Sequence, residues 1–133
     1  MIDLKTEYAG LKLRNPLIAG SSGLTNNPER NKEFEKAGVG AIVLKSLFEE
    51  QIEMQSSNLL KDSDYPEASD YVQEYVKVNQ VNEYLELIKK TKALCTIPII
   101  ASINCYKADN WIDFARQIEL AGADALELNV FYL

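Results

Sequence analysis

Residues 97–130, IPIIASINCYKADNWIDFARQIELAGADALELNV, contain the pattern that decides the fold. The nearly continuous apolar run over 97–103 predicts a buried strand, because a strand that is covered on both faces shows no alternation. Apolar residues recur at helical spacing over 109–121 and predict a helix that ends at Gly122. A second apolar strand is predicted over 123–130. Strand, helix and strand in succession indicate a right-handed βαβ unit of a parallel sheet.

The same unit recurs nearer the N-terminus. Residues 17–20 read as a short buried strand, and a flexible loop follows it. Asn27 and Pro28 are typical of a helix start, with Asn at the cap and Pro in the first turn. That helix is expected to end at Gly38, and the apolar run over 40–44 predicts the next strand.

Two further segments complete the chain. Alternating residues over 2–14 predict a short β-hairpin, which in a barrel usually covers one end. Residues 46–79 are the least regular part, and we expect a long excursion there with some helix near its end. From 81 to 94 apolar residues at helical spacing predict a helix.

Repeated βα units fit two architectures, an open doubly wound sheet or a closed eight-stranded barrel. A complete barrel takes about 250 residues, whereas this chain has 133 residues. The last predicted strand runs into the apolar residues 131–133, and no helix follows to cover it. We therefore interpret residues 1–133 as one incomplete α/β domain, the N-terminal half of a (β/α)8 TIM barrel preceded by a hairpin. Truncation, or a partner that supplies the rest, is expected.

Composition narrows the class of protein. The chain is 47% hydrophobic and 26% charged, which is typical of a soluble globular protein, and its net charge is −6. This acidity argues against binding to nucleic acid or to anionic membranes. No apolar run long enough to span a bilayer and no signal-peptide pattern is present, so we expect a cytoplasmic protein. The chain has no histidine, which excludes Ser-His and Cys-His mechanisms, and its two cysteines are too few for a zinc site, so no metal is expected.

Polar residues stand at the ends of three consecutive predicted strands. Lys45, Asn104 and Asn129 fall in the inward-facing register, and Glu127 lies one step deeper. The other inward positions are Ala41, Val43, Ile100, Ser102 and Ala125. The outward positions are Ile42, Leu44, Ile99, Ala101, Ile103, Leu126 and Leu128. Because active sites of barrels lie at the carboxyl ends of the strands, these polar residues are expected to converge on one site. Alternatively, the lysine only reaches solvent and the glutamate is a structural anchor.

Four short motifs resemble the dihydroorotate dehydrogenase family in their order and spacing. They are Asn15-Pro16-Leu17, Ser21-Ser22-Gly23, Leu44-Lys45-Ser46 and Glu127-Leu128-Asn129. The resemblance covers the hairpin and the first four barrel strands. It implies an FMN-dependent oxidoreductase of pyrimidine biosynthesis that oxidises a CH–CH bond in a pyrimidine-type small-molecule substrate.

The resemblance also implies roles for individual residues. The residues that it assigns to FMN are Ser21, Ser22, Gly23, Lys45, Ser46 and Asn129. Asn104, which stands at the same ends of the strands, is also expected to bind the cofactor. Tyr132 falls where the family carries its catalytic base, a Cys or Ser, although an unperturbed phenol titrates near 10. Because the family holds the FMN phosphate with loops after strands seven and eight, we expect that this chain alone binds FMN weakly and is inactive.

Two other functions fit the same residues. Barrels also support Schiff-base aldolases, in which Lys45 would be the nucleophile. Alternatively, the chain is a non-catalytic half-barrel assembly module. Because four parallel strands leave two unpaired edges, we expect a homo-oligomer or association with a C-terminal half-barrel.

Overall fold

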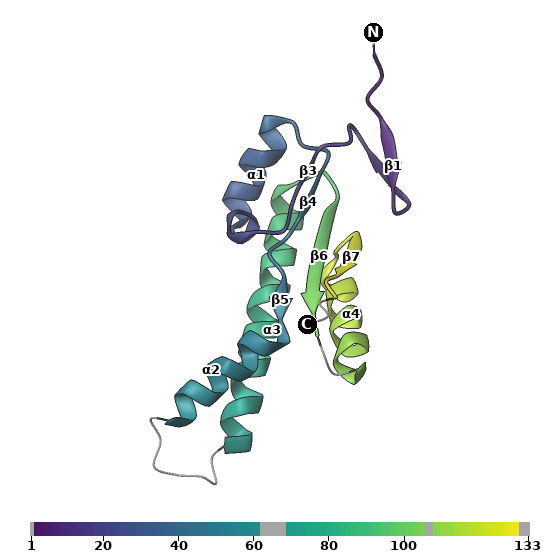
Figure 1. Ribbon diagram of the computed structural model, residues 1–133. Helices are drawn as coiled ribbons and strands as arrows, with labels where there is room; N and C mark the ends of the chain where they lie inside the picture. The colour runs from purple at the N-terminus through teal and green to yellow at the C-terminus, as the bar shows by residue number, and fades with distance from the viewer. Residues whose placement is uncertain (1, 62–68, 106–107, 131–133) are drawn as a thin grey trace.

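The computed structural model of the protein describes residues 2–61, 69–105 and 108–130 (Figure 1). An N-terminal antiparallel hairpin precedes a parallel sheet. The strands of the hairpin are β1 (Thr6–Tyr8) and β2 (Leu11–Leu13). The main strands of the sheet, in spatial order, are β3 (Ile18–Ala19), β4 (Ala41–Val43), β6 (Ile99–Asn104) and β7 (Ala125–Leu128). The short strand β5 (Leu47–Phe48) continues β4 along the same edge of β6. The parallel α/β architecture predicted from the sequence is therefore confirmed.

The helices cover one face of this sheet. They are α1 (Pro28–Ala37), α2 (Glu49–Lys61), α3 (Ser69–Leu94) and α4 (Ala108–Ala121), and a single 3-10 turn, η1, spans Gly23–Thr25. Helix α3 packs against α1, α2, α4 and β6. Figure 1 shows that α2 and the first turns of α3 extend beyond the sheet as an arm. Within the described residues, no helix is long and apolar enough to cross a membrane.

The two faces of the sheet carry the residues that alternation predicted. The face toward the helices carries Ile42, Leu44, Ile99, Ala101, Ile103 and, partly buried, Leu126. The opposite face carries Ala41, Val43, Ile100 and, partly buried, Ala125, and Leu13 of β2 covers it. The hairpin therefore closes one part of the inner face, as expected. Leu128 differs from the prediction, because it is 57% exposed beyond the cover of α4.

The helix expected near the end of the excursion over residues 46–79 is present, but the prediction that the rest is irregular was wrong. Most of its described part is helical, because α2 and the N-terminal half of α3 pack against each other. Their contact buries Ile52 of α2 and Val76 of α3. Such a narrow apolar stripe gives little helical signal in the sequence. Helix α3 consequently begins at Ser69 rather than near Val81.

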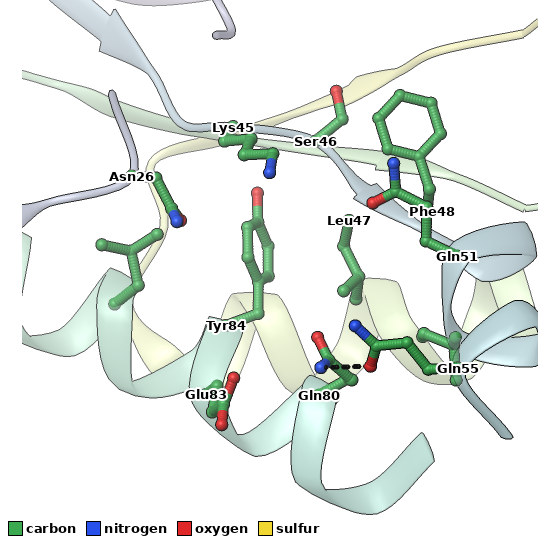
Figure 2. A pocket seen from close by; sticks show the side chains of 12 residues that line it. Asn26, Lys45, Ser46, Leu47, Phe48, Gln51, Gln55, Gln80, Glu83 and Tyr84 are labelled. Atoms are coloured by element: carbon green, nitrogen blue, oxygen red, sulfur yellow. Dashed lines mark hydrogen bonds between the residues drawn. The ribbon is translucent and has the colours of Figure 1, made fainter. Parts of the chain in front are cut away.

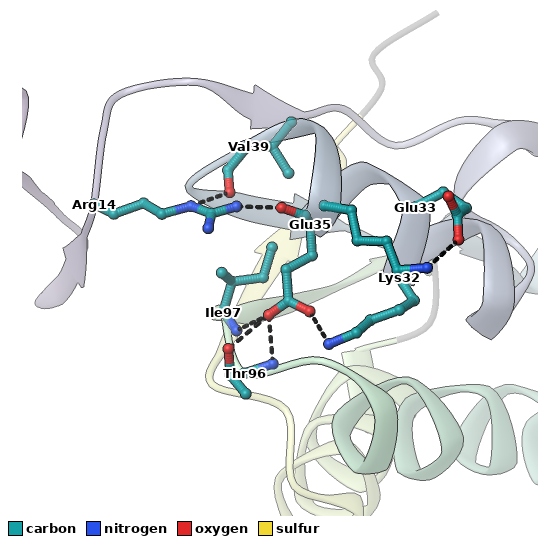
Figure 3. A network of polar contacts seen from close by, with 8 residues as sticks. Arg14, Lys32, Glu33, Glu35, Val39, Thr96 and Ile97 are labelled. Carbon is teal, nitrogen blue, oxygen red and sulfur yellow. Dashed lines mark hydrogen bonds and ion pairs between the residues drawn. The ribbon is translucent and has the colours of Figure 1, made fainter.

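Buried ionic contacts fix α1 to the sheet (Figure 3). The Glu35 carboxylate accepts hydrogen bonds from the backbone N–H groups of Thr96 (2.7 Å) and Ile97 (3.1 Å), and from the Thr96 hydroxyl (2.6 Å). Its other oxygen pairs with Lys32. Burial alone would raise the pKa of Glu35, but these donors outweigh burial and lower the pKa to about 2. The anchor sets the position of α1 relative to the start of β6.

Candidate functional site

The strand formed by β4 and β5 contains one extra residue. Ile42 and Val43 pair with Ile99 and Ile100, whereas Leu47 and Phe48 pair with Ile103 and Asn104. Residues 44–46 therefore stand opposite only residues 101–102, which defines a β-bulge. Bulges of this kind redirect side chains and occur frequently beside functional sites.

Hydroxyl groups replace the hydrogen bonds that the bulge removes. Leu44 still donates its N–H to the Ile100 carbonyl at 2.9 Å, so the regular ladder ends there. The Ser46 N–H, two residues further along the strand, instead donates to the Ser21 hydroxyl at 3.0 Å. The N–H and carbonyl of Ser102 both bind the Tyr84 hydroxyl, at 2.8 and 3.0 Å. Side-chain hydroxyls therefore satisfy the Ser46 N–H and both backbone groups of Ser102.

A row of polar side chains crosses the inner face of the sheet at the same level. Ser21 and Ser46 share a hydrogen bond of 3.1 Å between their hydroxyl oxygens, and Ser46 and Ser102 share one of 2.6 Å. Ser102 also binds the Glu127 carboxylate at 2.6 Å. Ser102 is fully buried, and Glu127 lies at the exposed edge. The hydroxyl row therefore connects all four parallel strands or the loops that follow them.

The two asparagines lie together one step closer to the carboxyl ends of the strands. Asn104 donates its amide N–H to the Asn129 carbonyl oxygen at 2.5 Å, and the Asn129 N–H continues the sheet by binding the Ile103 carbonyl. Both residues are partly buried. The expected convergence of Asn104 and Asn129 at one edge is therefore confirmed.

Lys45 does not join this group. It lines a cavity between the bulge and helices α2 and α3, together with Tyr84. Figure 2 shows Lys45 directed toward Tyr84, while the Ser46 hydroxyl points to the other side of the strand. The prediction that Lys45 shares the inward face of Ala41 and Val43 was wrong, because the extra residue of the bulge interrupts the alternation.

The remaining predicted site residues have simpler surroundings. Ser21, Ser22 and Gly23 are exposed in the loop after β3, where the Ser22 hydroxyl caps η1 by accepting from the Leu24 N–H at 3.2 Å. A Cβ atom added at Gly23 would meet no atom within 4 Å, so the loop leaves open space there. Tyr132 lies outside the described residues.

Comparison with known proteins matches nearly the whole chain. It is 29% identical over 140 aligned residues to the catalytic subunit of dihydroorotate dehydrogenase B (NAD(+)) of Thermoplasma volcanium, and 28% identical over 132 residues to that of Thermoplasma acidophilum. Each alignment covers 98% of this chain and 42% of the relative. A putative dihydroorotate dehydrogenase A (fumarate) of Aeropyrum pernix is 30% identical over 129 residues, which are 96% of this chain and 41% of that protein. No family model matches the chain.

The chain is similar to dihydroorotate dehydrogenases over nearly its whole length. It spans less than half the length of the curated dihydroorotate dehydrogenases that it matches. Sequence similarity extends through the hairpin, the bulged strand and β7, so the polar row lies within the aligned region.

Sequence reasoning missed two structural residues of this dihydroorotate dehydrogenase homologue. Ser102 was placed on the inward face but not recognised as the centre of the hydroxyl row. Tyr84 falls within the apolar pattern over 81–94, and that pattern did not predict that its hydroxyl completes the sheet at the bulge. The sequence contains a partial indication of the role of Tyr84, because a buried Tyr hydroxyl normally has a hydrogen-bond partner.

Cys105 follows β6 and has no sign of reactivity. It is buried, and burial together with the nearby Glu49 carboxylate raises the pKa of its thiol to about 12. A reactive cysteine needs a lowered pKa and access to solvent. The structure favours the interpretation of Cys105 as a small buried apolar residue.

Proposed function

We propose that the chain forms the N-terminal half of a (β/α)8 barrel in an FMN-dependent oxidoreductase. The proposed reaction is oxidation of a CH–CH bond in a pyrimidine-type substrate, with the flavin as hydride acceptor. Similarity to dihydroorotate dehydrogenases over 96–98% of the chain is the observation that carries the proposal. The right order of parallel strands and the inner face covered by the hairpin support the barrel.

The residues around the hydroxyl row fit a flavin in their chemistry. Hydroxyl and amide donors at strand ends can stabilise the negative charge that a flavin gains on reduction. Ser46 carries such a hydroxyl and Asn104 such an amide donor, and the exposed loop over 21–23 gives a flat ring access to the backbone. In the proposal the FMN contacts come from Ser21, Ser22, Gly23, Ser46, Asn104 and Asn129. The predicted contact of Lys45 with the flavin would require its stem to leave the cavity beside α3.

The general base in this proposal is assigned from the family resemblance alone. Tyr132 occupies the corresponding position in the sequence. Oxidation of a CH–CH bond removes a proton from one carbon and a hydride from the other, so a base must accept that proton. A phenol needs a strongly lowered pKa for this task at neutral pH.

The structure gives less support to a Schiff-base aldolase. A lysine that forms a Schiff base is activated in an apolar pocket or beside another cation. The cavity around Lys45 instead carries four amide side chains and Glu83. Borohydride trapping of a carbonyl substrate on Lys45 would favour the aldolase over the flavoenzyme.

The flavin proposal is tested on the product of the intact gene, by measuring its mass and visible spectrum together. We expect bound FMN in the intact product and little FMN on the 133-residue chain alone. The variants Ser46→Ala and Asn129→Ala should lower the FMN content, whereas Lys36→Gln at an exposed ion pair of α1 should not. An intact product without flavin absorbance would contradict the proposal, and stoichiometric FMN on the short chain would contradict the role of the missing half.

A partner is also part of the proposal. The outer strands of the sheet, β3 and β7, each have one unpaired edge within the described residues. Exposed edges pair readily with another chain. We propose that a second copy or a C-terminal half-barrel covers them. Sedimentation that shows only folded monomer at high concentration would contradict this.

A further inference from the structure

The carboxylate at one end of the hydroxyl row sets the direction of every hydrogen bond in it. An ionised carboxylate has no proton to donate, so Ser102 donates its hydroxyl proton to Glu127, at 2.6 Å. A serine hydroxyl holds one proton and two lone pairs. The bond between Ser46 and Ser102 must therefore be donated by Ser46. By the same reasoning the bond between Ser21 and Ser46 is donated by Ser21. All three protons point along the row toward Glu127.

The exposed end of the row then offers a ligand no hydroxyl proton. Ser46 is 7% exposed, whereas Ser21 lies open in the loop after β3. The Ser21 oxygen accepts the Ser46 N–H at 3.0 Å and keeps one lone pair free. A ligand group beside Ser21 is therefore bound when it is an N–H or O–H donor. A negatively charged ligand atom at the same place meets only the lone pair.

A proton on Glu127 would reverse the whole row. The protonated carboxyl would donate to the Ser102 oxygen, and each serine would then donate to its neighbour on the side of β3. One new bond forms, between a proton from water and the carboxylate, while the three hydroxyl protons only turn. The Ser21 oxygen then accepts both the N–H and the hydroxyl of Ser46, and its own proton is free for a ligand. Linked hydrogen bonds polarise one another, which favours one direction at a time.

Few charged groups face Glu127 in the part of the chain that the structure describes. Its strand neighbour β6 carries no charged side chain. On the inner face the hairpin contributes Leu13, and Arg14 beside it binds backbone carbonyls at the end of α1. Burial and the charge of Glu127 both raise the pKa of Tyr84, so the phenol keeps its proton. Helix α4 packs against β7 from the other face of the sheet, where its described charged residues are Asp113, Arg116 and Glu119.

We propose that Glu127 is the positioning residue of the hydroxyl row, and that proton uptake at Glu127 turns Ser21 from an acceptor into a donor. Ser102, which is fully buried, transmits the change from β7 to the loop after β3. Negative charge that develops on a ligand beside Ser21 is thereby coupled to a proton at the opposite end of the row. The direction of the row is independent of the flavin, whereas its effect on a flavin rests on the proposed function.

Neutron diffraction from deuterated crystals of the 133-residue chain locates the hydroxyl deuterium atoms, which X-ray maps at ordinary resolution do not show. At pH 8 we expect each of the three serines to direct its deuterium along the row toward Glu127. This measurement requires no flavin. A deuterium on Ser46 that points to Ser21 would overturn the proposal.

A pair of variants shows whether Glu127 controls the direction. Glu127→Leu removes the acceptor of Ser102, so the buried hydroxyl should donate to Ser46 instead and all three deuterium atoms should reverse. Because Glu127 lies at the exposed edge, the variant should fold. Glu33→Leu removes an exposed carboxylate from α1 and should keep the wild-type directions. The same directions in the wild type and in Glu127→Leu would overturn the role of Glu127.

The midpoint potential of the intact gene product tests the effect on the flavin. In Glu127→Leu the Ser21 donor is present without proton uptake. We therefore expect reduced FMN to gain about tenfold in affinity relative to oxidised FMN, which is a rise of about 30 mV. An unchanged potential would contradict the coupling to the flavin. An intact product without flavin would contradict the proposed function, and the deuterium positions would still decide the direction of the row.

Discussion

The Tyr84 hydroxyl donates a hydrogen bond to the Ser102 carbonyl at 3.0 Å and accepts one from the N–H of the same residue at 2.8 Å. One side chain of α3 thereby takes the place of a strand neighbour at the bulge. Burial raises the pKa of Tyr84 far above its ordinary value, although the bond to Ser102 opposes the rise. The hydroxyl therefore keeps its proton and remains a donor at neutral pH.

Removal of this hydroxyl should destabilise the fold. Tyr84→Phe leaves the buried N–H and carbonyl of Ser102 without their partner, so we expect the free energy of unfolding to fall by about 1–3 kcal/mol. Denaturation in urea measures the change. Tyr75→Phe is the matched control, because Tyr75 is 63% exposed on the same helix and its loss should cost less than about 0.5 kcal/mol. Equal stability of the two variants would show that the bulge does not need the phenol.

Glu35 should make the protein sensitive to acid. Its pKa is lowered from 4.5 to about 2, so its contribution to stability is fully present above pH 4.5 and is lost as the pH falls toward 2. Glu35→Gln cannot keep the ion pair with Lys32 and should lower the free energy of unfolding at pH 7 by about 2 kcal/mol. The variant should also show a flatter decline of stability between pH 5 and pH 2.

Unfolding curves at several pH values test the role of Glu35. The control is Glu33→Gln on the same helix, where the side chain is 68% exposed and pairs with Lys36 on the surface. We expect the control to follow the wild-type pH profile. If both variants behaved alike, the acid sensitivity would come from other carboxylates.

Gly40 lies where two backbone segments meet before β4. A Cβ atom at this position would collide with the carbonyl oxygen of Asn15. Since backbone cannot move as a flexible side chain does, Gly40→Ala should destabilise the protein by about 2 kcal/mol or more. Gly23→Ala is the control, because nothing lies within 4 Å of its added carbon atom. A difference in melting temperature between the two variants checks the prediction, and similar values would contradict it.

The two cysteines should resist alkylation in the folded protein. Both are free and buried, and burial raises the pKa of each thiol, to about 12 for Cys105. We expect mass spectrometry to find no iodoacetamide adduct on the native chain at pH 8 and two adducts after unfolding in guanidinium. Rapid modification of Cys105 in the native chain would mean that the thiol is open to solvent and chemically active.

Much of the fold could be predicted from short-range patterns. Continuous apolar runs predicted β4, β6 and β7, and Gly38 ends α1 with φ of 109°, as its position suggested. The excursion was less predictable, because α2 and the first turns of α3 stabilise each other through a contact between two separate segments. Their pairing depends on both segments together, so the sequence of either segment alone does not predict it.

The candidate site also has a part that local patterns predicted and a part that they did not. Alternation along a single strand placed Ser102, Asn104, Glu127 and Asn129 on one face, and the structure brings them to the same end of the sheet. Alternation failed at Lys45, where one extra residue stands opposite β6. Alternation along a strand predicts the face on which a side chain lies only while the hydrogen-bonding register with the neighbouring strand stays unchanged.

The sequence by itself determined the order of the parallel strands, the two faces of the sheet and the resemblance to dihydroorotate dehydrogenases. Those properties follow from the local alternation of apolar and polar residues and from residues at fixed spacing. Only the tertiary structure decided where Lys45 and Ser46 point, because the bulge exists only in relation to a strand more than fifty residues away. Tyr84 and Ser21 stabilise that bulge from two other elements, and their contacts with it cannot be predicted from any one segment of the sequence.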